Sequence, residues 1–188
     1  MSFSVCRSWA SRAASAAGVF LQTPGADAAR LAKTYAKRRN TMRVVLQRAL
    51  RAKVEIDGVT VGEIGRGWLV LLGIAHEDTP EMANALAEKI AHLRAFPDDA
   101  GKMNLSVQDI LGGVLVVSNF TLYANTAKGR RPSFLAAARP EIAEPLCEHF
   151  LNNLRALGVP VQSGRFGADM QIELVNDGPV TLILESPA

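Results

Sequence analysis

The amino-acid sequence predicts a single α/β domain of roughly eight strands and two long helices, preceded by a basic extension. Short β-branched and leucine-rich runs follow one another closely from Met42 onward, and two amphipathic patterns of helical period interrupt them. The close succession of strands, with one tight hairpin among them, excludes a simple repeated βαβ winding. The chain has 188 residues, of which 48% are hydrophobic, so it is long enough to bury a sizeable core.

The first predicted strands form a meander. Their side chains are mostly β-branched or leucine, and Asp57-Gly58 is a residue pair that favours a two-residue hairpin turn. A second break is expected at Gly65–Gly67. The strands are predicted at Val44–Gln47, Val54–Asp57, Val59–Ile64 and Trp68–Ile74.

A helix is predicted after the meander. Asp78 or Thr79 offers an N-cap, and Pro80 suits the first helical position, where its missing N–H costs no hydrogen bond. Apolar side chains then recur at spacings of four and three, the period of a buried helix face: Met82, Leu86, Ile90 and Leu93.

The middle of the chain returns to a strand pattern. Gly112-Gly113 precedes an apolar strand, Val114–Val117, which runs directly into Ser118–Leu122. A polar loop is expected from Asn125 to Ser133, because polar residues and glycine replace the apolar pattern there.

A second helix and two more strands complete the prediction. The helix is expected to begin near Pro140 and to stop at Gly158. Two final strands, Met170–Val175 and Val180–Glu185, are expected on either side of the turn Asp177–Pro179. The helix should pack on the sheet through an apolar stripe of strict spacing four: Ile142, Leu146, Phe150 and Leu154.

Charge is divided unevenly along the chain. The total is +3, but residues 1–41 hold seven Lys or Arg and one acidic side chain, so residues 42–188 hold 14 basic and 17 acidic side chains and carry −3. An RNA partner therefore needs a local basic patch, because the body repels phosphate weakly. The best local candidate is a loop with three cations in four residues, although a solvated loop explains it equally well: Lys128, Arg130 and Arg131.

Residues 1–41 are expected to be a disordered extension. An organellar transit peptide and an upstream start codon read in place of Met42 account for the same composition. The longest apolar run, Trp68–Ala75, has only strand length, so no membrane partner is expected. The two cysteines, Cys6 and Cys147, are too few for a disulfide framework, which favours a reducing, cytoplasmic location.

The motifs of the common hydrolases are absent from the sequence. The three histidines, His76, His92 and His149, are scattered and form no metal-binding pair, so neither a metal site nor a cofactor is predicted. No Gly-x-Ser-x-Gly elbow and no Gly-rich phosphate fingerprint occurs. The sequence therefore assigns no catalytic triad.

Two segments at strand ends remain as candidates for chemistry. One contains Ser118 and Thr121, and the other contains the Gly178-Pro179 step and Thr181. Each has a structural explanation when taken alone. Ser and Thr often close a strand by binding neighbouring backbone, and Gly and Pro often mark ordinary turns.

Seven short segments carry a further signal through their order: Gln47-Arg48, Val61–Gly65, Gly101–Asn104, Ser118–Tyr123, Lys128–Phe134, Gly164–Met170 and Asn176–Thr181. Together they resemble the D-aminoacyl-tRNA deacylase family. The resemblance runs from Met42 to about Ser186, which indicates a functional domain at residues 42–188. One position departs from the family motif, Ser-Gln-Phe-Thr-Leu, because Asn119 stands where Gln is expected.

The resemblance implies a fold and an activity. The fold is a mixed, mostly antiparallel sheet curved into a barrel-like form with two long helices packed on it. The activity is hydrolysis of the ester between a D-amino acid, or mischarged glycine, and the 3′ end of tRNA. The resemblance also implies a homodimer in which a cis Gly178-Pro179 segment enters the partner's active site. An L side chain would point into its carbonyls, so that selectivity comes from a clash.

The same resemblance implies roles for the motif around Ser118. Together with Phe120 and Thr121, this residue is expected to shape the pocket around the terminal adenosine and the ester. Backbone amides near Phe120 are the expected oxyanion donors, and the 2′-hydroxyl of the tRNA is expected to drive the reaction in place of a protein nucleophile.

Arg48 is expected to support the Gly178-Pro179 segment by binding backbone in or near it, with Asn176 and Thr181 as its neighbours. Two other hypotheses stay open. The chain can be a non-catalytic RNA- or partner-binding module that keeps the fold, or a Ser or Thr esterase that acts on a small ester.

Overall fold

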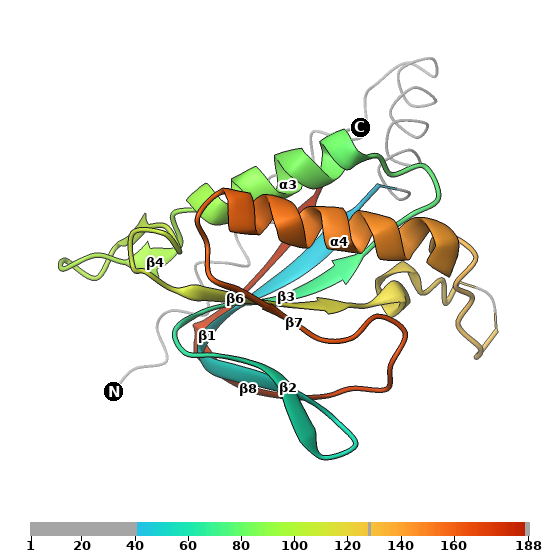
Figure 1. Cartoon of the computed structure of the whole chain (residues 1–188), viewed down its shortest axis with the longest axis horizontal. Coiled ribbons are helices and arrows are strands. Elements are labelled where there is room, and N and C mark those ends of the chain that lie inside the picture. The colour runs from blue at the N-terminus through green and yellow to red at the C-terminus, as the bar shows by residue number, and fades with distance from the viewer. Residues whose placement is uncertain (1–40, 128, 187–188) are drawn as a thin grey trace, which may run out of the picture. The chain divides into compact units, whose positions relative to one another are not determined.

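The computed structural model describes residues 41–127 and 129–186 (Figure 1). The expected extension, except for Thr41, and the predicted phosphate ligand Lys128 therefore lie outside the described residues. In chain order the elements are β1 (Arg43–Ile56), β2 (Val59–Ile64), β3 (Gly67–Gly73), α3 (Pro80–His92), β4 (Phe96–Pro97), β5 (Met103–Leu105), β6 (Gly113–Ser118), the 3₁₀ turn η1 (Phe120–Tyr123), α4 (Pro140–Ala156), β7 (Val161–Ser163) and β8 (Gln171–Glu185).

The long strand β1 organises the main sheet. One of its edges pairs first with β3 and then with β2, and its other edge pairs with β8, all antiparallel. Strands β6 and β7 extend the sheet in parallel. The sheet curves until a Cβ added to Gly62 of β2 would lie 3.0 Å from the Ser163 carbonyl oxygen of β7. This nearly closed, mixed and mostly antiparallel sheet confirms the expected fold class.

Two apolar clusters hold the fold together, one on each face of the sheet. Side chains alternate along a strand, so Trp68, Val70 and Leu72 of β3 face one cluster and Leu69 faces the other. The larger cluster lies under α3 and α4, which run side by side over one face of the sheet (Figure 1). The smaller lies within the curve of the sheet. Strands β3 and β6 are buried on both faces, which is why they read as continuous apolar runs.

Both predicted helices are present, and one expected core position is wrong. Thr79 caps α3, accepting a hydrogen bond from the Met82 amide. Ile142, expected in the buried stripe of α4, is 39% exposed. The strict spacing of four drifts around a helix of 3.6 residues per turn, so Ala143 faces the core in its place. No helix in the described part of the chain is long and apolar enough to cross a membrane.

The predicted boundaries of four strands are wrong, because the strands continue through bulges. Val44–Gln47 and Val54–Asp57 belong to the single strand β1, and Met170–Val175 and Val180–Glu185 belong to β8, apart from Met170 and Asp57. The register between β1 and β8 shifts on both sides of Ala49. Bulges interrupt the apolar pattern without ending the ladder. The turn at Asp57-Gly58 is confirmed, with φ values of 52° and 76°.

Asp78 gives the fold an unusual pH dependence. Its carboxylate accepts hydrogen bonds from the amides of Met42 (2.7 Å) and Ala75 (2.6 Å), yet burial raises its pKa to about 6. The folded state therefore binds a proton more tightly than the unfolded state does. This group should lower the free energy of unfolding by up to about 3 kcal/mol as pH rises from about 4 to 7.

The test is urea unfolding of wild type and Asp78→Asn across that pH range. The variant should have one acceptor fewer for the Met42 and Ala75 amides above about pH 6, where the wild-type carboxylate is ionised, and should lack the decrease contributed by the wild-type carboxyl. An identical pH dependence of the two proteins would show that the pKa of Asp78 is not raised.

Candidate active site

The Ser118 motif lies where β6 ends beside β3. Ser118 pairs with Leu72, and the Asn119 amide donates to the Leu72 carbonyl over 2.7 Å. The Asn119 side chain then caps η1, because its Oδ1 accepts from the amide and the hydroxyl of Thr121. A short Asx side chain suits such a local cap. The residue that departs from the family motif thus stabilises the turn that carries the motif.

A cleft of about 470 Å³ opens beside this turn. Phe120 and Phe134 meet edge to face on its wall, with ring centroids 5.1 Å apart and planes at 75°. Four parts of the chain converge here: the end of β3, the motif, the connection leading into α4 with the start of that helix, and the connection between β7 and β8. The lining residues are Leu72, Ile74, Ser118, Asn119, Phe120, Phe134, Ala137, Ala138, Arg139, Pro140, Ala143, Phe166, Gly167, Ala168 and Met170.

The electrostatics of the cleft favour an anion at one side. Among the described residues that line it, Arg139 is the only ionisable one. Arg139 is also the N-cap residue of α4, so the partial positive charge of that helix terminus points to the same place. The cleft is suited to a flat apolar group with a phosphate attached.

Thr121 is poorly placed to act as a nucleophile. Its side chain is exposed, it is not among the residues that line the cleft, and its hydroxyl donates to Asn119 Oδ1. An amide oxygen is a negligible base and cannot take the proton that a hydroxyl nucleophile must lose. Ser118, by contrast, is half-buried and lines the cleft.

The Gly178-Pro179 segment forms a loop within β8. Asn176 pairs with Ala49 and Thr181 pairs with Gln47, so residues 177–180 face a single residue of β1. Both Gly178 and Pro179 are exposed, and the bond between them is cis. The Asn176 side chain closes the base of the loop by donating to the Val180 carbonyl over 3.2 Å.

Arg48, the residue opposite this loop, anchors it. The guanidinium is buried, donates to the Ala95 carbonyl over 2.6 Å and forms an ion pair with Asp177 at 2.9 Å. A Cβ added to Gly178 would lie 3.2 Å from its Nη2 atom. Arg48 therefore supports the Gly178-Pro179 segment through its ion pair with the Asp177 side chain.

The two motifs lie apart within one chain. Arg48 pairs with Trp68 at the start of β3, whereas Ser118 pairs with Leu72 near its end. Four residues of strand separate these positions by about 13 Å in the strand direction, and β1 and β3 lie between β8 and β6. No residue from 176 to 181 lines the cleft.

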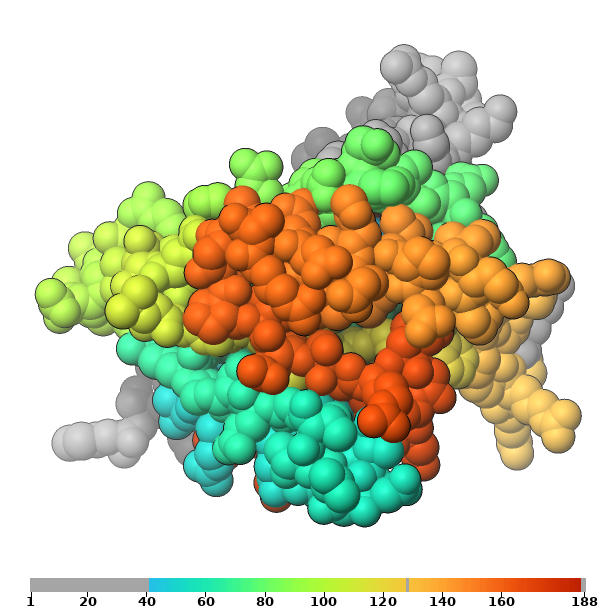
Figure 2. All heavy atoms as spheres, viewed as in Figure 1, coloured from blue at the N-terminus to red at the C-terminus, as the bar shows by residue number. Residues whose placement is uncertain are grey.

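The basic loop lies farther from the core. Backbone hydrogen bonds between Asn125 and Ser133 close its base, and Arg130 and Arg131 are exposed. In the space-filling view the segment near residue 130 projects from the body of the protein (Figure 2). Arg130 and Arg131 are thus accessible to a large polyanion.

Comparison with known families shows that one family model spans all of these site residues. The family model for D-Tyr-tRNA(Tyr) deacylase matches residues 45–185, which include both motifs, Arg48 and the cleft. The chain belongs to this deacylase family. A D-aminoacyl-tRNA deacylase from Halalkalibacterium halodurans is 57% identical over 145 residues, which are 77% of this chain and 99% of the relative. One from Chloroflexus aurantiacus is 59% identical over 145 residues, covering 77% and 91% of the two chains.

Solved structures agree with this deacylase-family fold. A protein described as c-Myc DNA Unwinding Element Binding Protein shares 44% identity and a TM-score of 0.73, covering 78% of this chain and 99% of its own. A probable eukaryotic D-amino acid tRNA deacylase shares the fold at 19% identity and a TM-score of 0.69, covering 77% and 99%.

Several residues of the deacylase-family cleft were not assigned to the site from sequence. Phe134, Phe166 and Met170 fall inside segments that carried the family resemblance, so the resemblance could have placed them. Arg139 has no such signal. Its position before the helix-starting Pro140 was the only available indication that it stands at a helix N-terminus.

Proposed function

We propose that this chain hydrolyses the ester between a D-amino acid, or mischarged glycine, and the 3′ end of tRNA, releasing the free amino acid and the tRNA. The observation that carries the proposal is the 57% identity to a D-aminoacyl-tRNA deacylase over 99% of that relative's length. The reaction needs no cofactor. The cytoplasm, where aminoacyl-tRNA meets the ribosome, is the compartment we assign to it.

The cleft suits the terminal adenosine of tRNA. The Phe120 and Phe134 rings offer apolar contact for a base, and Arg139 at the α4 N-terminus offers a partner for the phosphate that follows. The ester then lies near Ser118 and the Phe120 backbone amide, which is the oxyanion donor in this proposal.

The substrate's own 2′-hydroxyl fits the chemistry of this cleft. The described lining residues include no carboxylate or imidazole that could act as a general base. In the proposal the protein binds and orients the ester and stabilises the developing oxyanion, and the adjacent ribose hydroxyl assists the attack of water on the ester carbonyl. The bond to the ribose oxygen then breaks, that oxygen takes a proton, and the free amino acid leaves.

Stereochemical selection is assigned to Gly178 and Pro179 of a second subunit. The segment is exposed and is offset from the Ser118 motif by about 13 Å in the strand direction, with two strands between them, so a cleft acquires it most simply from a partner in a homodimer. Its carbonyls would receive the amino group of a D-aminoacyl or glycyl ester. An L side chain would clash with the same backbone.

The exposed arginines of the basic loop are assigned to tRNA phosphates. Neutralising them in Arg130→Gln/Arg131→Gln should weaken tRNA binding and reduce the slope of log K against log salt by about 0.7–0.9 for each phosphate that the protein no longer neutralises. Binding titrations at several salt concentrations measure this slope. The matched control neutralises two exposed cations at helix C-termini, Lys89→Gln/Arg155→Gln, and should leave it unchanged. A full slope in the loop variant would exclude the assignment.

The function itself is tested by comparing D-Tyr-tRNA with L-Tyr-tRNA as substrates of the purified protein. The proposal requires release of D-Tyr and little release of L-Tyr. Binding of tRNA without hydrolysis would favour a non-catalytic RNA-binding module. Hydrolysis of small esters that is abolished in both Ser118→Ala and Thr121→Ala would favour an esterase.

A further inference from the structure

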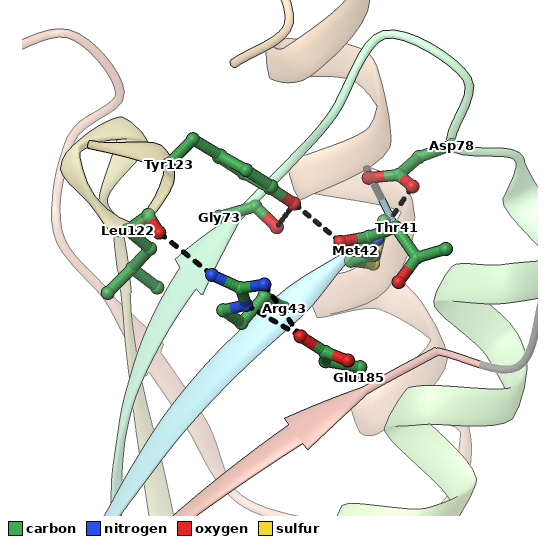
Figure 3. Close-up of polar contacts among 8 residues, drawn as sticks. All are labelled: Thr41, Met42, Arg43, Gly73, Asp78, Leu122, Tyr123 and Glu185. Carbon is green, nitrogen blue, oxygen red and sulfur yellow. Dashed lines mark hydrogen bonds and ion pairs between the residues drawn. The ribbon is translucent and has the colours of Figure 1, made fainter. Parts of the chain in front are cut away.

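The turn that carries the Ser118 motif is anchored at one buried point. Tyr123 is the buried residue of η1, and its hydroxyl contacts the carbonyls of Thr41 (2.7 Å) and Gly73 (3.2 Å) (Figure 3). These carbonyls belong to the residues before β1 and at the end of β3. Burial raises the pKa of the Tyr123 phenol above its ordinary value, so the hydroxyl keeps its proton and remains a donor.

Arg43 forms a second anchor beside the first. Its Nη1 donates to the Leu122 carbonyl over 3.1 Å, while Nε and Nη2 donate to Glu185 over 3.0 and 2.6 Å (Figure 3). The guanidinium also lies over the Tyr123 ring, 5.6 Å from its centroid. One planar group thus connects the turn to the last residue of β8.

Gly73 allows the turn to approach the sheet closely. A Cβ at this position would lie 2.9 Å from the Tyr123 ring, 3.2 Å from Leu122 Cβ and 3.3 Å from the Asn119 carbonyl oxygen. These distances are shorter than ordinary van der Waals contacts. The turn is therefore seated directly on the backbone of β3.

The remainder of the turn is held only by local contacts, the Asn119 cap on Thr121 and the packing of the Phe120 ring on Phe134. Phe120 and Thr121 are exposed, and η1 is only four residues long. A 3₁₀ turn of this length has poor hydrogen-bond geometry and depends on its surroundings. The side chains of Tyr123 and Arg43 tie this turn to the residues around β1, β3 and β8, and so help to set the position of the Phe120 ring and amide.

We propose that Tyr123 and Arg43 are positioning residues that hold the Ser118 motif in its reactive geometry, an inference that rests on the proposed deacylase function. Neither side chain lines the cleft. They act through the turn, because a shift of the Phe120 amide by about 1 Å is enough to cost a hundredfold in rate.

The experiment compares Tyr123→Phe and Arg43→Lys with wild type on D-Tyr-tRNA. Tyr123→Phe removes only the hydroxyl, and Arg43→Lys keeps the charge near Glu185 but cannot span both partners. Both variants should lower kcat by about tenfold to a hundredfold and leave KM within about twofold. Hydrogen exchange of residues 119–124 should be faster in both.

The control is Lys53→Gln, on the same strand as Arg43 but far from the turn, which removes ion pairs to Glu55 of β1 (2.8 Å) and Glu173 of β8 (2.9 Å). It should change neither kcat nor the exchange of residues 119–124. An unchanged kcat in folded Tyr123→Phe, or an equal fall in Lys53→Gln, would overturn the inference. Failure of wild type to hydrolyse D-Tyr-tRNA would instead reject the proposed function.

Discussion

Replacing Gly178 with alanine is expected to reduce deacylation of D-aminoacyl-tRNA by about a hundredfold or more. Gly178 has φ +121°, a conformation that L side chains rarely adopt, and an added Cβ would lie 2.8 Å from Val180 Cγ2 and 3.0 Å from the Val180 amide nitrogen. The loop must therefore shift, and the proposed carbonyl wall shifts with it. Because the loop is exposed, the free energy of unfolding should fall by only about 1–3 kcal/mol.

The matched control for this substitution is Gly58→Ala. Gly58 also has positive φ, +76°, but an added Cβ meets nothing within 4 Å. It should lower stability to a similar extent and leave the rate of deacylation unchanged. Steady-state kinetics and urea unfolding of both variants separate the two effects. Equal activity of Gly178→Ala and Gly58→Ala would contradict the role given to the segment.

A mixed dimer tests whether Gly178 acts on its partner's cleft. Heterodimers of one Gly178→Ala chain and one Phe120→Ala chain, isolated through two different affinity tags, would contain one intact site if the segment acts across the interface. Their activity should then reach about half that of wild type, whereas each parent homodimer stays inactive. No recovery in the heterodimer, or a monomeric wild-type protein, would contradict a shared site.

Replacing Arg48 with methionine is expected to lower the free energy of unfolding by about 3 kcal/mol and to reduce activity in the folded fraction. The substitution leaves the Ala95 carbonyl and the Asp177 carboxylate without their buried partner. The Asp177 side chain is 25% exposed, which places the loss at the lower end of the range for broken buried pairs. Urea unfolding at neutral pH measures the effect.

The double variant Arg48→Met/Asp177→Asn identifies the cause of this loss. Removing the charge of Asp177 should restore about 1–2 kcal/mol relative to Arg48→Met, because the unpaired carboxylate is then gone. Equal stability of the single and double variants would show that packing and the Ala95 hydrogen bond account for the whole loss.

The sequence alone was sufficient for most of the secondary structure and for the family. The N-cap at Thr79, the hairpin at Asp57-Gly58 and the apolar strand before Ser118 all depend on interactions within a few residues, which local patterns record directly. The family resemblance likewise resides in short segments, and the match over residues 45–185 confirms it.

The features that the sequence did not predict depend on contacts between residues far apart in the chain. The bulges that keep β1 and β8 continuous arise from pairing between strands more than a hundred residues apart, and no local pattern distinguishes them from strand ends. The burial of Arg48 follows from a carboxylate and a carbonyl that only the fold brings to it. The cleft is similar, since Phe134 and Arg139 come from the connection leading into α4 and Phe166 comes from the connection between β7 and β8.

The Ser118 motif and the Gly178-Pro179 segment show the same division between what the sequence predicts and what the fold decides. Their residue types and order were enough to indicate a deacylase, because the resemblance resides in short segments that can be read directly from the sequence. Tertiary structure decided that the Ser118 turn is seated on Gly73 and contacted by Tyr123 and Arg43, and that Gly178-Pro179 forms a loop offset from it by about 13 Å in the strand direction. Distances between segments are set by strand register and packing, which a linear pattern does not contain.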